Sequence, residues 1–146
     1  MNLARSRAVT NVRFIDQQPR AKIPAYIAAS DVALVLLRNS ALFKTVIPTK
    51  MLECMSCARP VILGVDGQAR KILDEAQAGI FVEPENAKVL ANTVRTLAAS
   101  PELCNLLGRN GRRYIVEHFS RQRTAKTYIS LLENLPDKRR QLPAQA

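Results

Sequence analysis

The amino-acid sequence predicts an α/β domain built on a parallel β-sheet with helices on both faces. Short apolar runs alternate with segments of helical spacing over the first hundred residues, which is typical of parallel strands joined by right-handed helical crossovers. The run VALVLL at residues 32–37 is continuously apolar, as in a strand that is covered on both faces. Beyond Ser100 only helical patterns follow, so we expect a helical C-terminal extension.

The first part of the chain is predicted to form two strands and two helices. The apolar run VRFI at residues 12–15 predicts a strand, and residues 23–30 predict a helix with a proline in its first turn. Residues 32–37 predict the second strand. After a loop, a second proline begins a helix over residues 48–57.

The middle of the chain continues the alternation of strands and helices. Residues 61–63 predict a third strand that ends in glycines, and residues 68–77 resume helical spacing. Residues 80–82 predict a fourth strand. A Pro-Glu-Asn turn then separates this strand from a helix over residues 87–99.

The C-terminal part is predicted to contain two helices and no strand. Pro101 starts the first of these helices, which Gly108 and Gly111 are expected to loosen. Ser120 is a suitable N-cap for a final helix that runs through Asn134.

Length and composition indicate one folded domain, residues 1–135, followed by a loose basic tail at residues 136–146. Hydrophobic residues at 47% and charged residues at 23% exclude a disordered or disulfide-dense chain. No apolar run approaches the roughly 18 residues of a membrane span, and the N-terminal segment has no apolar signal core. Three cysteines fit a reducing compartment. We therefore expect a cytoplasmic protein.

The chain carries a large positive charge, because 22 Lys and Arg residues against 12 Asp and Glu residues give a net charge of +10. Such a charge attracts anions, and nucleic acid, an acidic membrane surface and a phosphorylated small molecule would all satisfy it. Aromatic residues make up only 5%, which disfavours RNA binding by base stacking. A basic band is expected on the last two helices, either as a solvated face or as a surface for an anionic partner: Arg109, Arg112, Arg113, Arg121, Arg123 and Lys126.

Two loops are candidate ligand sites, because ligands of open parallel sheets bind at the carboxyl ends of the strands. The loop after VALVLL carries Lys44 and Thr45 ahead of the helix that Pro48 begins. The free N–H groups and the positive dipole end of such a helix favour an anion. The loop after PVIL carries Gly64 and Gly67, which let a ligand approach the backbone closely.

The helix after this first loop places Lys50, Glu53, Cys54 and Cys57 on one face. A carboxylate at Glu53 can accept hydrogen bonds from vicinal sugar hydroxyls, as the acidic residue of dinucleotide sites does with a ribose. The alternative is a surface pair between Lys50 and Glu53 worth ~0.2–0.5 kcal/mol, and spacing alone favours this alternative.

The cysteines of this helix have the C-x-x-C spacing. A zinc site needs about four ligands, and only Cys104 and His118 remain, far away in the sequence. Cys54 and Cys57 also stand late in their helix, whereas thiolates are activated at helix N-termini. Core packing is therefore the favoured interpretation, and no metal site is predicted.

These residues together resemble a known family. The segments NVRFIDQQPRAKIPAYIAASDVALVLL, VIPTKMLECMSCARPVILGVDGQARKILDEAQAGIFVEPEN and LLGRNGRRYIVEHFS carry the resemblance, which covers residues 11–135. The chain resembles the C-terminal, donor-binding domain of retaining glycosyltransferases of the two-Rossmann-domain (GT-B) type, group 1 or family 4 like. Its most specific piece, P-T-K-x-x-E-x-M-S-x-x-x-P-V-I, is similar to the branch that builds bacterial exopolysaccharide and O-antigen sugars, including colanic-acid-type and N-acetylfucosaminyl transferases.

The resemblance implies a partial Rossmann-like fold, a UDP- or GDP-linked sugar as donor substrate, and no separate cofactor. Its acceptor would be a growing glycan or a lipid-linked saccharide in cell-surface polysaccharide synthesis. Glu53 would hold the nucleotide ribose, and no catalytic residue is assigned. The implied nucleotide contacts are Pro48, Thr49, Lys50 and Glu53, and the implied phosphate or sugar contacts are Lys44, Thr45, Val46, Ile47, Gly64 and Gly67.

The sequence departs from the family pattern in two respects. Thr45 stands where many relatives carry the acidic residue that precedes Glu53 by eight positions, so we expect different contacts to the transferred sugar. The acceptor-binding domain and the first strand and helix of the donor domain are not in the sequence. We therefore expect a partial domain, with the rest on a partner chain or lost, that transfers no sugar alone. A lipid-linked acceptor would bring it to the inner face of the membrane.

Two other functions are compatible with the residues. The first is a basic module that binds nucleic acid or a partner protein without catalysis, which a steep salt dependence of nucleic-acid binding would identify. The second is a nucleotide-sugar epimerase, which has a similar donor domain. Release of free UDP would separate sugar transfer from epimerisation.

Overall fold

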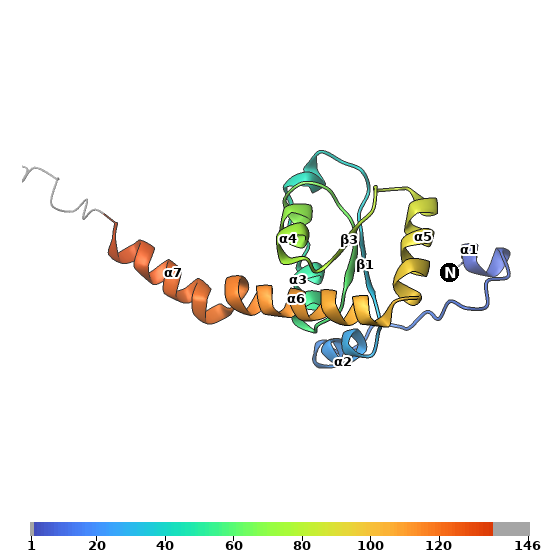
Figure 1. Cartoon of the computed structure of the whole chain (residues 1–146), viewed down its shortest axis with the longest axis horizontal. Coiled ribbons are helices and arrows are strands. Elements are labelled where there is room, and N and C mark those ends of the chain that lie inside the picture. Colours follow the sequence, from blue (N-terminus) through green and yellow to red (C-terminus); the bar gives the residue numbers. More distant parts are fainter. Residues whose placement is uncertain (1, 136–146) are drawn as a thin grey trace, which may run out of the picture.

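The computed structural model describes residues 2–135 and contains one parallel sheet in this part of the chain (Figure 1). Its strands are β1 (Ala33–Leu36), β2 (Val61–Gly64) and β3 (Gly79–Phe81), in the order β1-β2-β3. The helices are α1 (Asn2–Ser6), α2 (Ile23–Ala28), α3 (Thr49–Ser56), α4 (Gln68–Ala76), α5 (Ala87–Ala98), α6 (Pro101–Phe119) and α7 (Arg121–Glu133), with short 3-10 helices η1 (Arg20–Lys22) and η2 (Leu42–Thr45). The predicted α/β class, parallel sheet and helical C-terminal extension are confirmed.

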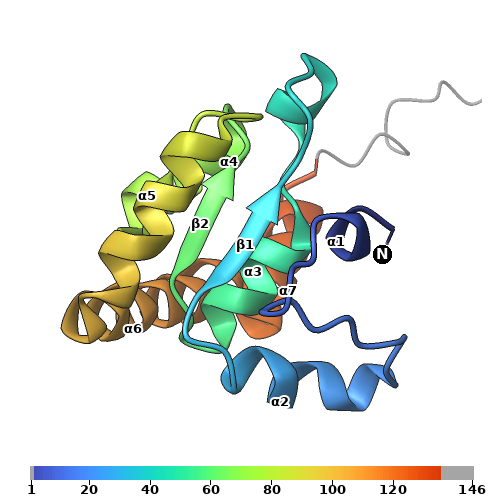
Figure 2. The same cartoon turned by 90° about the vertical axis from the view of Figure 1, so that its right-hand side faces the viewer.

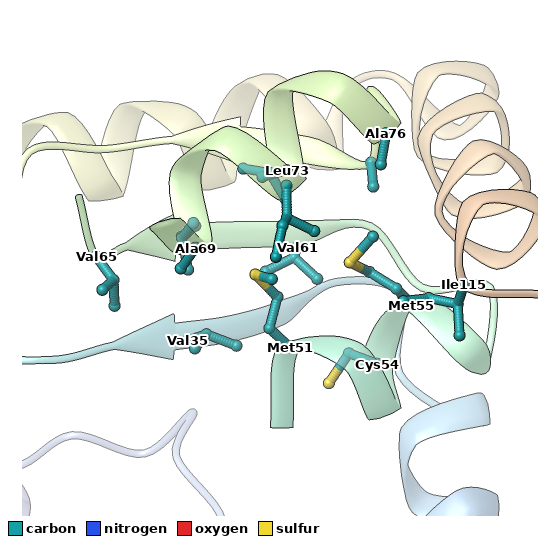
Figure 3. Packing of buried hydrophobic residues seen from close by; sticks show 13 residues of the cluster. Val35, Met51, Cys54, Met55, Val61, Val65, Ala69, Leu73, Ala76 and Ile115 are labelled. Carbon is teal, nitrogen blue, oxygen red and sulfur yellow. The ribbon is translucent and has the colours of Figure 1, made fainter. Parts of the chain in front are cut away.

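Helices cover both faces of the sheet (Figure 1). On one face, Met51 of α3 and Leu73 of α4 share a buried cluster with the side chains of β2 (Figure 3). On the other face, Leu97 of α5 packs with Ile62 of β2. Helix α6 contributes Ile115 to the first cluster and several partly buried side chains to the second, so it joins the two layers.

The helices and strands predicted from residue 23 onward all form, and their ends differ from the predicted ends by one or two residues. The loop predicted between the first two of these strands contains the short η2. Helix α1 was not predicted from the sequence.

The predicted strand at residues 12–15 is wrong. These residues lie in an irregular segment between α1 and η1 (Figure 2), where Val12 is 49% and Phe14 is 52% exposed. A strand requires a hydrogen-bonded neighbour, and this segment pairs with no strand in the described part of the chain. The apolar pattern alone was therefore not sufficient to predict a strand here.

The expected loosening of α6 at its glycines is also wrong, because α6 runs unbroken from Pro101 to Phe119. Both glycines are buried. A side chain at Gly108 would collide with the carbonyl oxygen of Ala58, and a Cβ at Gly111 would lie 3.0 Å from the Cβ of Ala78. These glycines allow α6 to pack closely against the domain.

Strand β1 is apolar but is covered on one face only, which corrects the expectation of cover on both. Val35 is 3% exposed, whereas Leu34 is 46% and Leu36 is 45% exposed. Helix α5 covers the equivalent face of β2, and no described element covers Leu34 and Leu36 in the same way.

Helix α7 continues from α6 and projects away from the sheet (Figure 1), with its side chains exposed. Among the helices of residues 2–135, none combines the length and the apolar character that crossing a bilayer requires. The predicted loose tail at residues 136–146 lies outside the described residues.

Candidate functional site at the carboxyl end of the sheet

The loops after β1 and β2 meet at the carboxyl end of the sheet, as the sequence predicted. Both strands point toward this end in Figure 2. Gly67 has a φ of 85° and lies so close to Lys44 that a side chain at Gly67 would collide with the Lys44 carbonyl oxygen. Glycine is thus required both by the backbone conformation and by the contact between the two loops.

Helix α3 begins at this meeting point with unpaired backbone donors. Pro48 is its N-cap and provides no side-chain hydrogen bond, and the first helical bond runs from the Met51 N–H to the Pro48 carbonyl at 3.0 Å. The N–H groups of Thr49 and Lys50 have no acceptor among the described residues. Together with the positive end of the helix dipole, these groups favour an anion.

Glu53 lies near this helix start with an exposed side chain. The alternative interpretation of Glu53, a surface pair with Lys50, does not form in the structure. The backbone carbonyl of Glu53 accepts the Ser56 hydroxyl at 2.7 Å, whereas its carboxylate has no partner among the described residues. The carboxylate is therefore free to accept hydrogen bonds from a ligand.

The segment that precedes α3 presents apolar side chains and the Lys44 ammonium group. The Thr45 hydroxyl donates to the Leu42 carbonyl at 2.9 Å, so it is engaged within its own turn. Val46 and Ile47 are 37% and 39% exposed, and the Lys44 side chain is exposed. Lys44 is thus the side chain of this segment best suited to contact a phosphate.

Asp66 lies in the second loop, close enough to Lys44 for the two charges to interact. The Gly67 N–H hydrogen bond lowers the pKa of the Asp66 carboxyl, and the charges of Arg70 and Lys44 lower it further. Arg70 approaches Asp66 at 3.5 Å, and its guanidinium lies 4.1 Å from the centre of the Phe81 ring. Asp66 remains ionised, and its charge partly offsets that of Lys44.

Gly64 lies in a neighbouring hollow rather than beside Gly67. It is buried at the end of β2, where a Cβ would lie 2.8 Å from Leu36 Cδ2. It lines a pocket of about 330 Å³ between the end of β1 and the turn before α5. Arg38 lines this pocket and also the small hollow beside Lys44 and Asp66, so the two spaces adjoin.

Sequence reasoning did not identify Arg38 or Glu83, which both line the pocket beside Gly64. The position of Arg38 could have identified it, because it directly follows the VALVLL run and so must lie at the carboxyl end of its strand. For Glu83, the corresponding signal is its place immediately after residues 80–82.

Cys54 is part of the core, as predicted. It is 3% exposed, and burial raises the pKa of its thiol to about 11. Its three-residue spacing from Cys57 therefore reflects packing rather than an activated thiolate. The described residues contain no group of three or more His, Cys, Asp or Glu side chains that could hold a metal ion.

Comparisons with known proteins place these features in a family. Residues 2–114 match the family of glycosyl transferases group 1. Comparison with curated proteins gives no match. Among solved structures, sucrose-phosphate synthase from Thermosynechococcus elongatus is similar over 92% of this chain and 34% of its own length, with 22% identity and a TM-score of 0.71.

The Anabaena protein HepE, solved in complex with UDP, is similar over 80% of this chain and 31% of its own, with 20% identity and a TM-score of 0.64. The chain thus spans about a third of the length of these two proteins. At such identities the structural likeness shows the fold, and the family match covers most of the chain. The chain belongs to the glycosyl transferases of group 1.

Proposed function

We propose that residues 1–135 form the donor-binding domain of a glycosyltransferase that uses a UDP- or GDP-linked sugar. The observation that carries the proposal is the contact of Lys44 with Gly67, which brings both loops to the uncapped start of α3. A diphosphate at this point would accept hydrogen bonds from the Thr49 and Lys50 N–H groups. The presence of UDP in the HepE structure supports a uridine nucleotide as ligand class.

In this proposal each predicted residue has a physical task. The Glu53 carboxylate accepts hydrogen bonds from the ribose hydroxyls, and the Lys44 ammonium neutralises part of the diphosphate charge. Pro48, Val46 and Ile47 hold the segment that leads into α3. Gly67 lets the two loops meet, and Gly64 leaves room for the Leu36 side chain, so both shape the space beside the transferred sugar. Thr45 contributes its backbone because its hydroxyl is engaged.

Calorimetric titration with UDP, GDP and the two uncharged nucleosides tests the proposal. The diphosphates are expected to bind more tightly than the nucleosides. Glu53→Gln is expected to weaken nucleotide binding about tenfold, because the amide replaces charge-assisted hydrogen bonds worth ~1.5–3 kcal/mol each with weaker neutral ones. Glu133→Gln on α7 is the matched control and leaves binding unchanged. Tight binding that ignores Glu53→Gln would place the site elsewhere.

The proposed acceptor is a growing glycan or a lipid-linked saccharide in cell-surface polysaccharide synthesis, and transfer needs an acceptor-binding domain. Two observations support a further domain. The similar solved chains are about three times as long, and the apolar face of β1 is half exposed. The isolated chain is expected to bind nucleotide but to transfer no sugar. Transfer of labelled sugar by the purified chain alone would contradict this expectation.

A lipid-linked acceptor also requires contact with an anionic membrane surface, for which the basic band is the proposed element. Arg109 and Arg113 flank a shallow pocket of about 320 Å³ with Val116, and all six basic side chains are exposed. Flotation with anionic and neutral vesicles tests this contact. Arg109→Gln with Arg113→Gln is expected to weaken anionic binding by about thirtyfold, since each residue contributes ~1 kcal/mol. Equal recovery with both vesicle types would reject the contact. The tail cations Lys138, Arg139 and Arg140 lie outside the described residues.

A further inference from the structure

Helix α7 presents an apolar stripe that faces solvent in the described structure. The stripe recurs at helical spacing and occupies less than half of the helix circumference; its members are Ala125, Tyr128, Ile129, Leu131 and Leu132. Its four larger side chains are between 49% and 63% exposed, and no residue of α7 is buried. No α7 side chain belongs to either buried cluster, and the helix projects away from the sheet (Figure 1). The described domain therefore does not fill this stripe.

The opposite face of α7 is polar and positively charged. Arg123 and Lys126 lie on this face, and Arg121 stands at the start of the helix. Helix α7 contains three basic residues and one acidic residue, Glu133, and none of these four side chains makes an ion pair with the described residues. An apolar stripe thus runs along a helix of net positive charge.

The stability of α7 in water depends on what covers its stripe. Ser120 ends α6 with an extended backbone and caps α7, because its hydroxyl accepts the Arg123 N–H at 3.4 Å. Beyond this cap, α7 is an exposed helix of 13 residues, a length at which isolated helices are marginal in water. Packing of an amphipathic face is the main source of helix stability in proteins, so α7 gains from a partner along the stripe.

We propose that α7 is an amphipathic helix that lies in the surface of an anionic membrane, with its apolar stripe among the acyl chains. Helices with basic residues on one face and aromatic and aliphatic residues on the other bind membranes in this way. The long stems of Arg123 and Lys126 can lie along the apolar surface while their charges reach the lipid phosphates. The positive charge of α7 is thus complementary to such a surface.

A second copy of α7 fits the stripe less well than a membrane does. A coiled coil uses a narrow seam of apolar residues sustained over at least three heptads, whereas the stripe of α7 is wider and the helix has 13 residues. The inference rests on the membrane contact proposed for the basic band, to which it adds the insertion of α7. It does not rest on nucleotide binding.

A single tryptophan can report the insertion, because the sequence contains none. The fluorescence of Tyr128→Trp is recorded with vesicles of phosphatidylcholine and phosphatidylglycerol and with vesicles of phosphatidylcholine alone. On the anionic vesicles we expect a blue shift and quenching by lipids that are brominated near the headgroup end of their acyl chains. Tyr26→Trp on α2, where Tyr26 is 43% exposed, is the matched control and is expected to stay unquenched.

Two double variants test whether the stripe contributes to affinity. Ile129→Gln with Leu132→Gln removes apolar area, and we expect binding to anionic vesicles to weaken about tenfold or more. Thr127→Gln with Ser130→Gln places the same side chains on the polar face and is expected to leave binding unchanged. Circular dichroism without vesicles shows that each variant folds, and the helical signal of the wild type is expected to rise on anionic vesicles.

The outcomes separate α7 from the basic band. Binding to anionic vesicles without quenching of the tryptophan in Tyr128→Trp would overturn the insertion and leave the contact of the basic band in place. Affinity that falls in Arg109→Gln with Arg113→Gln but not in Ile129→Gln with Leu132→Gln would do the same. No binding to anionic vesicles would overturn both. Blue-shifted emission of Tyr128→Trp without vesicles, rising with protein concentration, would assign the stripe to a second copy instead.

Discussion

Strands β1 and β2 have similar apolar sequences but different surroundings. Every residue of β2 is buried, with β1 on one side, β3 on the other and helices on both faces. In β1 only Val35 is buried, while Leu34 and Leu36 are nearly half exposed. The comparison shows that an apolar run with one pairing neighbour forms a strand, whereas the burial of its side chains depends on which further neighbours are present.

The hydrogen bonds of β1 show what this strand lacks. The Ala33 N–H donates to the Pro60 carbonyl at 2.9 Å, and the Leu37 N–H donates to the Gly64 carbonyl at 3.3 Å. In a parallel pair alternate residues bond to the same neighbour, so Leu34 and Leu36 direct their backbone groups toward the open edge. In a doubly wound sheet with strand order 3-2-1-4-5-6, the fourth strand pairs with the first, and β1, β2 and β3 follow one another as strands four to six do.

The largest expected effect concerns the buried strand. Leu63→Ala in β2 removes a side chain that is 0% exposed, and we expect it to lower the free energy of unfolding by about 2–5 kcal/mol. The matched substitution Leu34→Ala in β1 is expected to lower it far less, because much of that side chain is already in contact with water. Urea unfolding monitored by circular dichroism measures both. Equal losses would mean that Leu34 is covered in solution.

The next effect concerns the close approach of α6. Helix propensity alone predicts that Gly108→Ala stabilises the protein, since alanine is favoured over glycine in a helix by about 1 kcal/mol. The structure predicts the opposite sign, because the new methyl group would collide with the Ala58 backbone carbonyl. We expect a loss of about 1–3 kcal/mol in the free energy of unfolding. Gain of stability in the same urea experiment would show that α6 does not pack this closely.

A smaller effect on the free energy of unfolding is expected from the buried thiol of Cys54. Burial raises the pKa of Cys54 to about 11, whereas in the unfolded chain this pKa returns toward the ordinary thiol value of 9.0. The native state thus binds the proton more tightly, so this thiol stabilises the fold below about pH 9 and that stabilisation is lost as the pH rises toward 11. Urea unfolding of the wild type and Cys54→Ala across this pH window tests the sign. A wild-type stability that falls no faster than that of Cys54→Ala would contradict it.

The sequence was sufficient to predict the fold from residue 23 onward, because each predicted strand there has a parallel strand to pair with. It was insufficient for residues 12–15, where the pattern of a strand is present but no pairing strand is. The meeting of Lys44 with Gly67 followed from the rule that parallel strands end at one edge. The cleft at the amino end of the sheet, between the loops that lead into β1 and β2 and the ends of α5 and α6, could not be predicted in this way. Those loops carry no motif, and only the packing of the helices brings its residues together.

The smallest effect on stability, and the sharpest test of the comparison, concerns the open edge of β1. Exposed apolar edge strands without charged or proline residues promote association between chains, and β1 has neither. Leu34→Lys with Leu36→Lys is therefore expected to change the free energy of unfolding by less than about 0.5 kcal/mol while reducing concentration-dependent association. Light scattering over a concentration series measures that association.

Leu131→Lys with Leu132→Lys on the exposed α7 is the matched control, because it adds the same charge away from the sheet. If both double substitutions reduce association equally, added charge rather than the β1 edge accounts for the effect. If the β1 substitutions instead unfold the protein, Leu34 and Leu36 are covered in solution and the contrast with β2 fails.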